Sequence, residues 1–235
     1  MNTSTDTIVA PATASGGAIA VIRLSGPEAI ACCDRIFRGR KPLAEAAGHT
    51  LHYGEVIDGD RTIDDVVAAI YRAPHSYTGE DAVELSCHGS PYIVSEIIAL
   101  LLRSGARMAQ PGEFTIRAFL AGRMDLAQAE AVAEMIAAPS KEGARLAAAK
   151  LDGVLGQRIG DLRERLEHLR AQICLAVDFP EEEVECLPQE GFLSAIADVK
   201  AAVASLLAGF ERTRCWREGV TVVLAGPVNA GKSSL

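Results

Sequence analysis

The feature that most constrains this chain is a change in the spacing of its apolar residues near residue 113. Before that point, short apolar runs alternate with turn residues, and both strand-like and helix-like spacings occur. After it, apolar residues recur almost throughout at the three- and four-residue spacing of amphipathic helices. The sequence therefore predicts an α+β domain followed by an all-α domain.

Several short segments define the first of these domains. The run GAIAVIRL (17–24) is apolar and bounded by glycines, and it predicts a buried strand. The runs 51–57 and 62–73 flank the turn sequence DGDR and predict a β-hairpin, and DAVELSCHG (81–89) predicts a further strand. Ser25, followed three residues later by Glu28, predicts a capping box that opens a helix.

Helical spacing begins with the segment that follows Ser90. One face of this predicted helix carries Val94, Ile97, Ile98, Leu101 and Leu102, and Gly105 suits a left-handed cap. Farther on, an apolar stripe predicts one long helix over 151–173. A second long helix is predicted from about 190 to 212, and Pro180 followed by three glutamates predicts a helix start. The stripe consists of Leu151, Leu155, Ile159, Leu162, Leu166, Leu169 and Ile173.

Composition excludes several classes of protein. Hydrophobic residues make up 49% of the 235 residues, which is enough for a substantial core. The net charge of −8 is divided evenly, with 10 basic and 14 acidic residues up to residue 120 and 13 and 17 after it, so the bulk charge does not reveal whether a nucleic acid is a partner. The six scattered cysteines contain no C-x-x-C pair, which argues against a secreted disulfide scaffold. Without an apolar N-terminal region or an apolar stretch free of charge, we expect no membrane span and a cytoplasmic location.

The last residues contain a phosphate-binding motif. Residues 226–233 read GPVNAGKS, which is the pattern G-x-x-x-x-G-K-S, and the apolar run 219–226 predicts the strand that precedes such a loop. The two glycines let backbone N–H groups turn toward a polyphosphate, the lysine supplies a point charge, and the serine hydroxyl of Ser233 can ligate Mg²⁺. The predicted nucleotide-binding residues are Gly226, Asn229, Ala230, Gly231, Lys232, Ser233 and Ser234. The motif by itself does not distinguish GTP from ATP.

The helix and the acidic metal-holding segment that normally follow this motif do not occur in the sequence. We therefore expect the chain to be a truncated piece of a longer protein. Residues that catalyse nucleotide hydrolysis are expected beyond Leu235, and the chain alone is expected to hydrolyse no nucleotide.

Five stretches together resemble one family, the tRNA-modification GTPases called MnmE or TrmE. The resemblance covers essentially the whole chain in the family's order. The stretches are DTIVAPATASGGAIAVIRLSG (6–26), APHSYTGEDAVELSCHGSP (73–91), PGEFTIRAFLAGRMDLAQAEAVAEMI (111–136), AVDFPEEEVE (176–185) and GPVNAGKSSL (226–235).

This resemblance implies a domain organisation. Residues 1–120 would form an α+β folate-binding and dimerisation domain, similar in fold to the T-protein aminomethyltransferase of glycine cleavage. Residues 121–217 would form the first part of an all-α helical domain. Residues 218–235 would supply the first β-strand and the P-loop of an α/β Ras-like G domain.

The resemblance also implies a function for the full-length protein. It would be a K⁺-dependent GTPase that acts as a homodimer with the flavoprotein MnmG, in a heterotetramer-type complex. Together they would add a carboxymethylaminomethyl-type group to C5 of the wobble uridine of certain tRNAs. The implied cofactors are GTP, Mg²⁺, K⁺ and 5-formyl- or methylene-tetrahydrofolate as the one-carbon donor. The alternatives are a folate-binding dimerisation scaffold, or a stand-alone folate-dependent aminomethyltransferase, without GTPase activity.

Three residues match the family's folate-binding positions. From the residues alone, Arg23 either reaches solvent from a strand end or grips a polar ligand group with its planar guanidinium. Glu80 is either a solvated loop acid or an acceptor for the donor edge of a pterin, and Asp81 competes with it for that role. Arg123 stands where the family usually has lysine, which keeps the charge but changes the donor geometry.

In the P-loop, the resemblance implies that Asn229 helps to coordinate K⁺, with Ser233 on Mg²⁺. The family usually has proline directly before this asparagine, whereas this chain has Val228, with its proline at Pro227. Elsewhere, the adjacent Cys87 and His88 point to opposite faces of their predicted strand, so packing is favoured over a shared metal or thiol chemistry.

Overall fold

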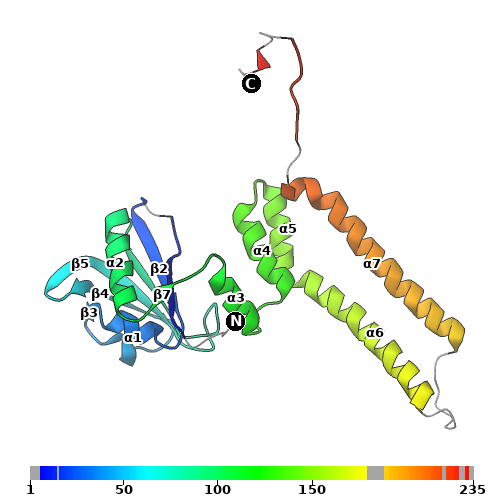
Figure 1. Ribbon diagram of the computed structural model, residues 1–235, viewed down its shortest axis with the longest axis horizontal. Coiled ribbons are helices and arrows are strands. Elements are labelled where there is room, and N and C mark those ends of the chain that lie inside the picture. The colour runs from blue at the N-terminus through cyan, green and yellow to red at the C-terminus, as the bar shows by residue number, and fades with distance from the viewer. Residues whose placement is uncertain (1–5, 15, 179–187, 219–220, 228–230, 233–235) are drawn as a thin grey trace. The chain divides into compact units, whose positions relative to one another are not determined.

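The computed structural model describes residues 6–14, 16–178, 188–218, 221–227 and 231–232 of the chain. By its contacts, the chain divides into two compact units, residues 1–125 and residues 126–235, which Figure 1 shows as an α/β part and a helical part. Each unit has its own architecture and is described by itself.

A seven-stranded sheet forms the first unit, with strand order β3-β4-β5-β6-β2-β1-β7. Neighbouring strands are antiparallel except for β1 and β7, which are parallel. The strands are β1 (Ile8–Pro11), β2 (Ile19–Ser25), β3 (Phe37–Gly39), β4 (Thr50–Asp58), β5 (Arg61–Tyr71), β6 (Ala82–His88) and β7 (Arg107–Met108). The predicted strands and the predicted hairpin are thus confirmed, as β2, β4, β5 and β6.

Two helices cover the core face of this sheet, α1 (Ala29–Asp34) and α2 (Pro91–Arg103) (Figure 1). Ile97 and Leu101 of α2 are fully buried together with Ile22 of β2 and Leu85 of β6. Gly105 adopts the left-handed conformation with φ 105°, as the sequence predicts for the end of α2. The unit also contains a 3₁₀ turn, η1 (Leu43–Glu45), and α3 (Glu113–Leu120).

The predicted capping box at Ser25 is wrong. Ser25 is the last residue of β2, and its hydroxyl bonds to Thr78 and Glu80 rather than to the start of a helix. Glu28 precedes α1 without a side-chain cap, and its backbone N–H donates to the Thr7 hydroxyl at 2.9 Å. A longer-range contact therefore engages the side chain that the local pattern assigned to capping.

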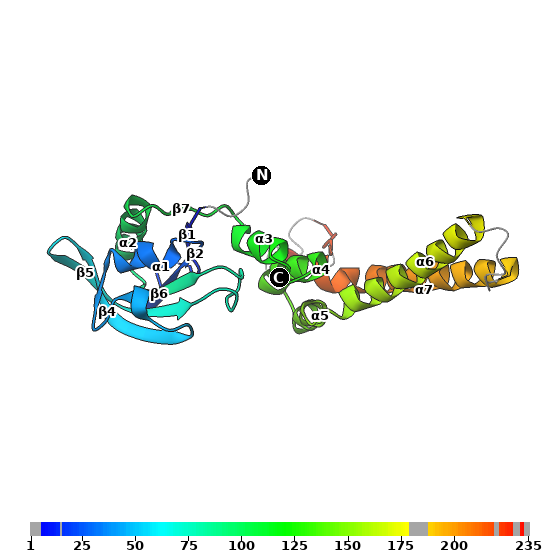
Figure 2. The same cartoon turned by 90° about the horizontal axis from the view of Figure 1, so that it is seen from below.

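The second unit consists of helices. Its elements are α4 (Leu126–Ala137), α5 (Lys141–Leu151), α6 (Val154–Asp178) and α7 (Gln189–Glu218). Ser140 caps α5 by accepting the Gly143 N–H at 3.1 Å. The long helices α6 and α7 run antiparallel side by side, as both Figure 1 and Figure 2 show.

Two predictions for this unit need correction. The single helix predicted over 151–173 is instead divided, because Leu151 ends α5 and Gly153 turns the chain with φ 79° before α6 begins. The predicted strand before the P-loop does not form within residues 221–227, where Val222 and Val223 are 77% and 80% exposed. A strand needs a neighbouring strand with which to exchange backbone hydrogen bonds. No strand of the described residues pairs with residues 221–227. The helix start predicted at Pro180 lies outside the described residues.

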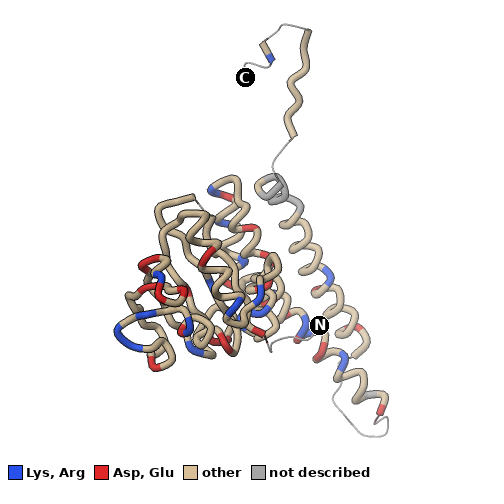
Figure 3. The backbone as a smooth tube through the Cα atoms, turned by 60° about the vertical axis from the view of Figure 1, so that its left-hand side comes forward, with Lys and Arg blue, Asp and Glu red and all other residues tan. Residues whose placement is uncertain are grey.

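Charges of both signs are mixed along the chain, whereas hydropathy singles out one helix. Figure 3 shows basic and acidic residues interspersed along the chain, in line with the even division of charge in the sequence. Residues 189–210 of α7, with mean hydropathy 1.6, are long and apolar enough to cross a membrane by length and composition alone. The sequence predicts no membrane span, and one such helix is weak evidence against that prediction.

Candidate functional site

A pocket of about 210 Å³ opens on the first unit. Its walls come from β2, β5, the 72–81 loop and β6, and they combine one basic and one acidic side chain with two tyrosines and two hydroxyls. The lining residues are Arg23, Ser25, Tyr71, Tyr77, Thr78, Ala82 and Glu84.

Strand register explains why these residues meet. Arg23 pairs with Glu84 across β2 and β6, and Ser25 pairs with Ala82. Tyr71 of β5 is also opposite Ala82. Since alternate residues of a strand share a face, all five lie on the face opposite the buried Ile22 and Leu85.

Arg23 is held on this face by Glu84. Its Nε donates to Oε1 of Glu84 at 2.8 Å, and its Nη2 forms an ion pair with the same oxygen at 2.7 Å. The guanidinium carbon lies 5.4 Å from the ring centroid of Tyr77 and 5.8 Å from that of Phe114, within cation–π range. With its side chain 31% exposed, Arg23 is neither buried nor freely solvated.

Glu80 lies behind the pocket wall. One of its carboxylate oxygens accepts from the Ser25 hydroxyl at 2.6 Å, and the Nη1 of Arg117 lies 3.2 and 3.3 Å from the two oxygens. Ser25 also bonds to Thr78 at 2.6 Å, and both hydroxyl residues line the pocket. The Glu80 carboxylate therefore reaches the pocket through hydroxyl groups. The competing Asp81 accepts the Ala73 N–H instead and braces the loop.

Arg117 joins Glu80 to a wider network of charges. This arginine of α3 is only 8% exposed, and it also donates to the side chains of Asp6 and Glu113 at 2.7 and 3.1 Å. Arg107 bonds to the same two carboxylates. Hydrogen bonds from Arg107, reinforced by the Gln110 N–H and by Arg117, lower the pKa of Glu113 to about 2. Arg107 also lowers the pKa of Asp6, so both acids stay ionised as partners of the buried Arg117.

Arg123 lies beside the loop that carries Glu80. A Cβ added to Gly79 would be 3.5 Å from Cγ and Cδ of Arg123, so the arginine stem crosses the loop at this glycine. Gly79 itself has φ 81°, in the left-handed region that favours glycine. The Arg123 side chain is exposed and does not line the pocket, unlike Arg23.

Sequence reasoning missed Glu84 and the two tyrosines as members of this site. The alternation of β6 contains a usable signal, because Glu84 interrupts an apolar strand two positions after Ala82 and shares its outer face. Burial together with the charge of Glu84 raises the pKa of the neighbouring Tyr71, whose hydroxyl lies 3.5 Å from Glu84 Oε2. Tyr77 and Thr78 have no comparable signal, because a loop positions them.

Part of the predicted P-loop lies within the described residues. Gly231 has φ 76°, a conformation that favours glycine, and Lys232 Nζ donates to the carbonyl oxygens of Gly226 and Pro227 at 3.0 and 2.6 Å. The lysine thus bonds to the loop's own backbone. The remaining predicted nucleotide and metal residues lie outside the described residues: Asn229, Ala230, Ser233 and Ser234.

Cys87 and His88 occupy opposite faces of β6, as their adjacency predicts. Cys87 is 3% exposed in the core, and burial raises the pKa of its thiol to about 11. His88 is exposed and bonds through Nδ1 to Asp64 at 2.6 Å, which raises the pKa of the imidazole. A thiol with a raised pKa is a poor nucleophile, so this pair does not form a catalytic arrangement.

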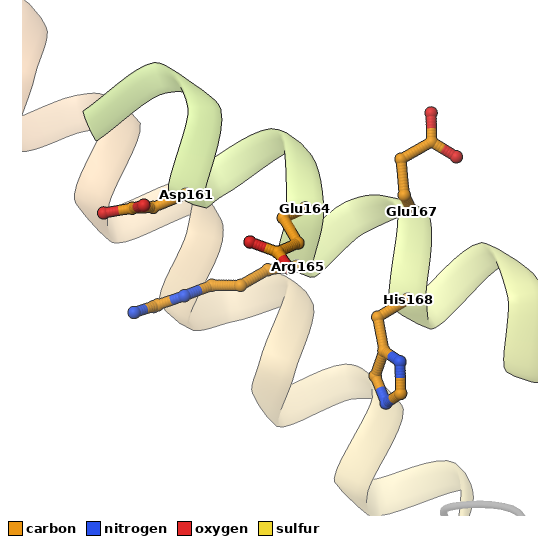
Figure 4. A pocket seen from close by; sticks show the side chains of 5 residues that line it. All are labelled: Asp161, Glu164, Arg165, Glu167 and His168. Carbon is orange, nitrogen blue, oxygen red and sulfur yellow. The ribbon is translucent and has the colours of Figure 1, made fainter. Parts of the chain in front are cut away.

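A larger hollow of about 630 Å³ lies along α6, but it lacks the features of a binding site. Its lining side chains all come from just over two turns of one helix, and Figure 4 shows Glu167 and His168 pointing away from each other. Convergent polar groups, and not volume alone, are what a ligand site requires. These side chains are Asp161, Glu164, Arg165, Glu167 and His168.

Comparison with known proteins assigns both units. The family profile described as GTP-binding protein TrmE N-terminus matches residues 7–123, and the profile described as MnmE helical domain matches residues 126–226. Curated relatives named tRNA modification GTPase MnmE are 56% identical in Nitratidesulfovibrio vulgaris (strain DP4), 48% in Lawsonia intracellularis and 45% in Bacteroides thetaiotaomicron.

Each of these matches covers 98% of the chain but only 50 to 51% of the relative. The chain therefore spans about half the length of the curated relatives it matches, namely their N-terminal part. Two adjoining family profiles and a similarity along nearly the whole sequence agree with each other. The chain belongs to the MnmE (TrmE) family of tRNA modification GTPases.

Proposed function

We propose that the first unit binds a reduced folate, with its pterin ring in the pocket between Arg23 and the two tyrosines. The observation that carries the proposal is the Arg23–Glu84 pair, which lines the pocket with the rings of Tyr77 and Phe114 beside its guanidinium. A flat ring with donors and acceptors along its edge fits a site that offers guanidinium N–H groups, hydroxyls and a carboxylate together. At about 210 Å³, the pocket suits the ring system, and the rest of a folate would extend beyond it.

The three folate residues take different places in this proposal. Arg23 would contact the ligand directly, because its side chain lines the pocket. Glu80 would act behind the pocket wall, where its carboxylate accepts from the Ser25 hydroxyl and its backbone N–H donates to the Thr78 hydroxyl, both of which line the pocket. Arg123 would reach the ligand from the loop at Gly79, where its longer, planar head replaces the lysine usual in the family.

For the full-length protein, the names of the relatives support a role as a GTPase in tRNA modification. We infer that it acts as a homodimer in the cytoplasm with the flavoprotein MnmG. The pair would modify C5 of the wobble uridine of certain tRNAs, with a one-carbon unit from 5-formyl- or methylene-tetrahydrofolate. GTP would bind at the P-loop of residues 226–233, with Ser233 on Mg²⁺, Asn229 on K⁺ and Lys232 on the outer phosphates.

Calorimetry tests the folate site. The chain is titrated with 5-formyltetrahydrofolate, and Arg23→Ala is expected to weaken binding by about tenfold or more, since charge-assisted hydrogen bonds each contribute about 1.5–3 kcal/mol. The control is Arg38→Ala, because Arg38 forms a similar cross-strand pair with Glu55 on β3 and β4, outside the pocket. If the folded wild-type chain binds no reduced folate, the proposed site is wrong.

A further inference from the structure

Glu84 is the acidic member of the pocket, and its whole carboxylate is directed at pocket residues. Oε1 accepts from Nε of Arg23 and lies 2.7 Å from its Nη2, and Oε2 lies 3.5 Å from the hydroxyl of Tyr71. The Glu84 side chain is 25% exposed, so the ion pair is partly shielded from water and stronger than a fully exposed pair.

Aromatic rings lie close to the guanidinium of Arg23. Tyr77 and Phe114 lie within 6 Å of the guanidinium carbon of Arg23. Tyr77 is itself fixed through a 2.9 Å bond between its hydroxyl and that of Thr115 on α3. Arg23 is therefore restrained at one edge by Glu84 and alongside by rings that belong to the loop and to α3.

This arrangement leaves donors available. A guanidinium has five N–H groups, and the hydrogen bond to Glu84 uses the one at Nε, while Nη2 is held 2.7 Å from the same oxygen by the ion pair. Because the position of Nε and Nη2 is fixed, the direction of the remaining N–H groups is fixed as well. An arginine without such a partner would have to be ordered by the ligand, at a cost in conformational entropy that weakens binding.

We propose that Glu84 is a positioning residue of the ligand site, which orients the Arg23 guanidinium before a ligand arrives. The proposal rests on the proposed folate function and adds a role for a residue outside the three folate positions. It predicts that Glu84 contributes to affinity only through Arg23. If the carboxylate merely stabilised the sheet, its removal would instead lower the stability of the fold, whatever residue stood at position 23.

A double-mutant cycle separates these roles. Binding of 5-formyltetrahydrofolate is measured for wild type, Glu84→Gln, Arg23→Ala and the double variant, with thermal unfolding recorded for each. Glu84→Gln, which keeps the size of the side chain, is expected to weaken binding about tenfold in wild type and less than about twofold in the Arg23→Ala background. Glu55→Gln is the matched control: it breaks the equivalent pair with Arg38 and is expected to leave affinity unchanged.

Two further measurements keep the test independent of folding defects and of the ligand's identity. Glu84→Asp retains the charge on a shorter stem, and it is expected to bind more tightly than Glu84→Gln. Without ligand, the side-chain Nε–H resonance of Arg23 in a ¹⁵N-labelled chain, assigned through its loss in Arg23→Lys, should be sharp and slow to exchange. In Glu84→Gln it should broaden or exchange rapidly, while the backbone spectrum stays folded.

The outcomes distinguish this inference from the function on which it rests. If wild type binds folate and Glu84→Gln binds it equally well, or if the two substitutions are additive, Glu84 does not position Arg23 and only this inference fails. An Arg23 Nε–H resonance that is unchanged in Glu84→Gln leads to the same conclusion. If wild type binds no folate, the proposed function fails and the role of Glu84 at a folate site fails with it.

Discussion

The charge network under the pocket predicts that substituting Glu113 destabilises the first unit in a pH-dependent way. Glu113 accepts from Arg107 at 2.5 and 2.9 Å, from the Gln110 N–H at 2.8 Å and from Arg117 at 3.1 Å. Together these donors lower its pKa from 4.5 to about 2, and its side chain is 13% exposed. Such a shift corresponds to about 3 kcal/mol of stability when the carboxyl is ionised in both states.

The sign of the pH dependence follows from the lowered pKa of Glu113. A carboxyl with a lowered pKa in the folded state binds its proton more weakly there than in the unfolded chain. Its contribution is therefore complete above about pH 5 and is lost as the pH falls through about 2. Glu113→Gln is accordingly expected to cost about 3 kcal/mol at pH 7 but only about 1 kcal/mol at pH 3.

Native-state hydrogen exchange measures this cost for the first unit alone. Peptides from the central strands β2 and β6 report its opening, which avoids a two-state treatment of a chain with two units. Glu28→Gln is the control, because Glu28 lies 3.9 Å from Arg35 in an exposed pair and should cost less than about 1 kcal/mol. A Glu113→Gln cost that is equal at pH 3 and pH 7 would refute the reasoning, since it would show loss of packing and not of charge.

Two more predictions concern positions outside the pocket. A Cβ at Gly89 would lie 2.1 Å from the Gly17 carbonyl oxygen, so Gly89→Ala is expected to lower stability by about 1–3 kcal/mol in thermal unfolding; Gly160→Ala, which meets nothing within 4 Å, should be neutral or stabilising. The pKa of His88, followed by NMR, should lie above its ordinary value of 6.5 and fall in Asp64→Asn. Any stability from this pair is present below pH 6.5 and is lost as the pH rises through the pKa of His88 in the folded state. If the pKa of His88 were unchanged in Asp64→Asn, Asp64 would not be the group that raises it.

Where the fold could be predicted, neighbouring residues carried the information. The turn sequence between β4 and β5 and the apolar face of α2 are patterns within about a dozen residues. The hairpin and the helix are confirmed, but Leu102 of the predicted face is 38% exposed and Leu100 is buried instead. The errors occur where a contact from elsewhere decides. Ser25 matches a helix cap locally, but Glu80, 55 residues away, binds its hydroxyl. The helix predicted through Gly153 ends there because a left-handed residue turns the chain.

Some residues of the candidate site can likewise be found from the sequence, and others cannot. Arg23 was identified through a family resemblance, and the structure places it in the pocket wall. Arg117, which holds Glu80, was not singled out from the sequence. Its partners Asp6 and Glu80 lie 111 and 37 residues away, and an arginine in an amphipathic helix is ordinarily read as exposed. No local pattern reports that this arginine is buried among three carboxylates.

The pairing of Arg23 with Glu84 nevertheless follows from apolar residues that never touch a ligand. Ile22 and Leu24 must face the core, as must Val83 and Leu85, and all four are fully buried. Once the two strands are antiparallel neighbours, a one-residue slip would turn one of these apolar sets toward water, so the register is fixed. Strand alternation then leaves Arg23 and Glu84 directly opposite each other on the outer face. The hydrophobic core thus determines which charges meet in the pocket, and a core substitution that shifted the register of β6 would separate them.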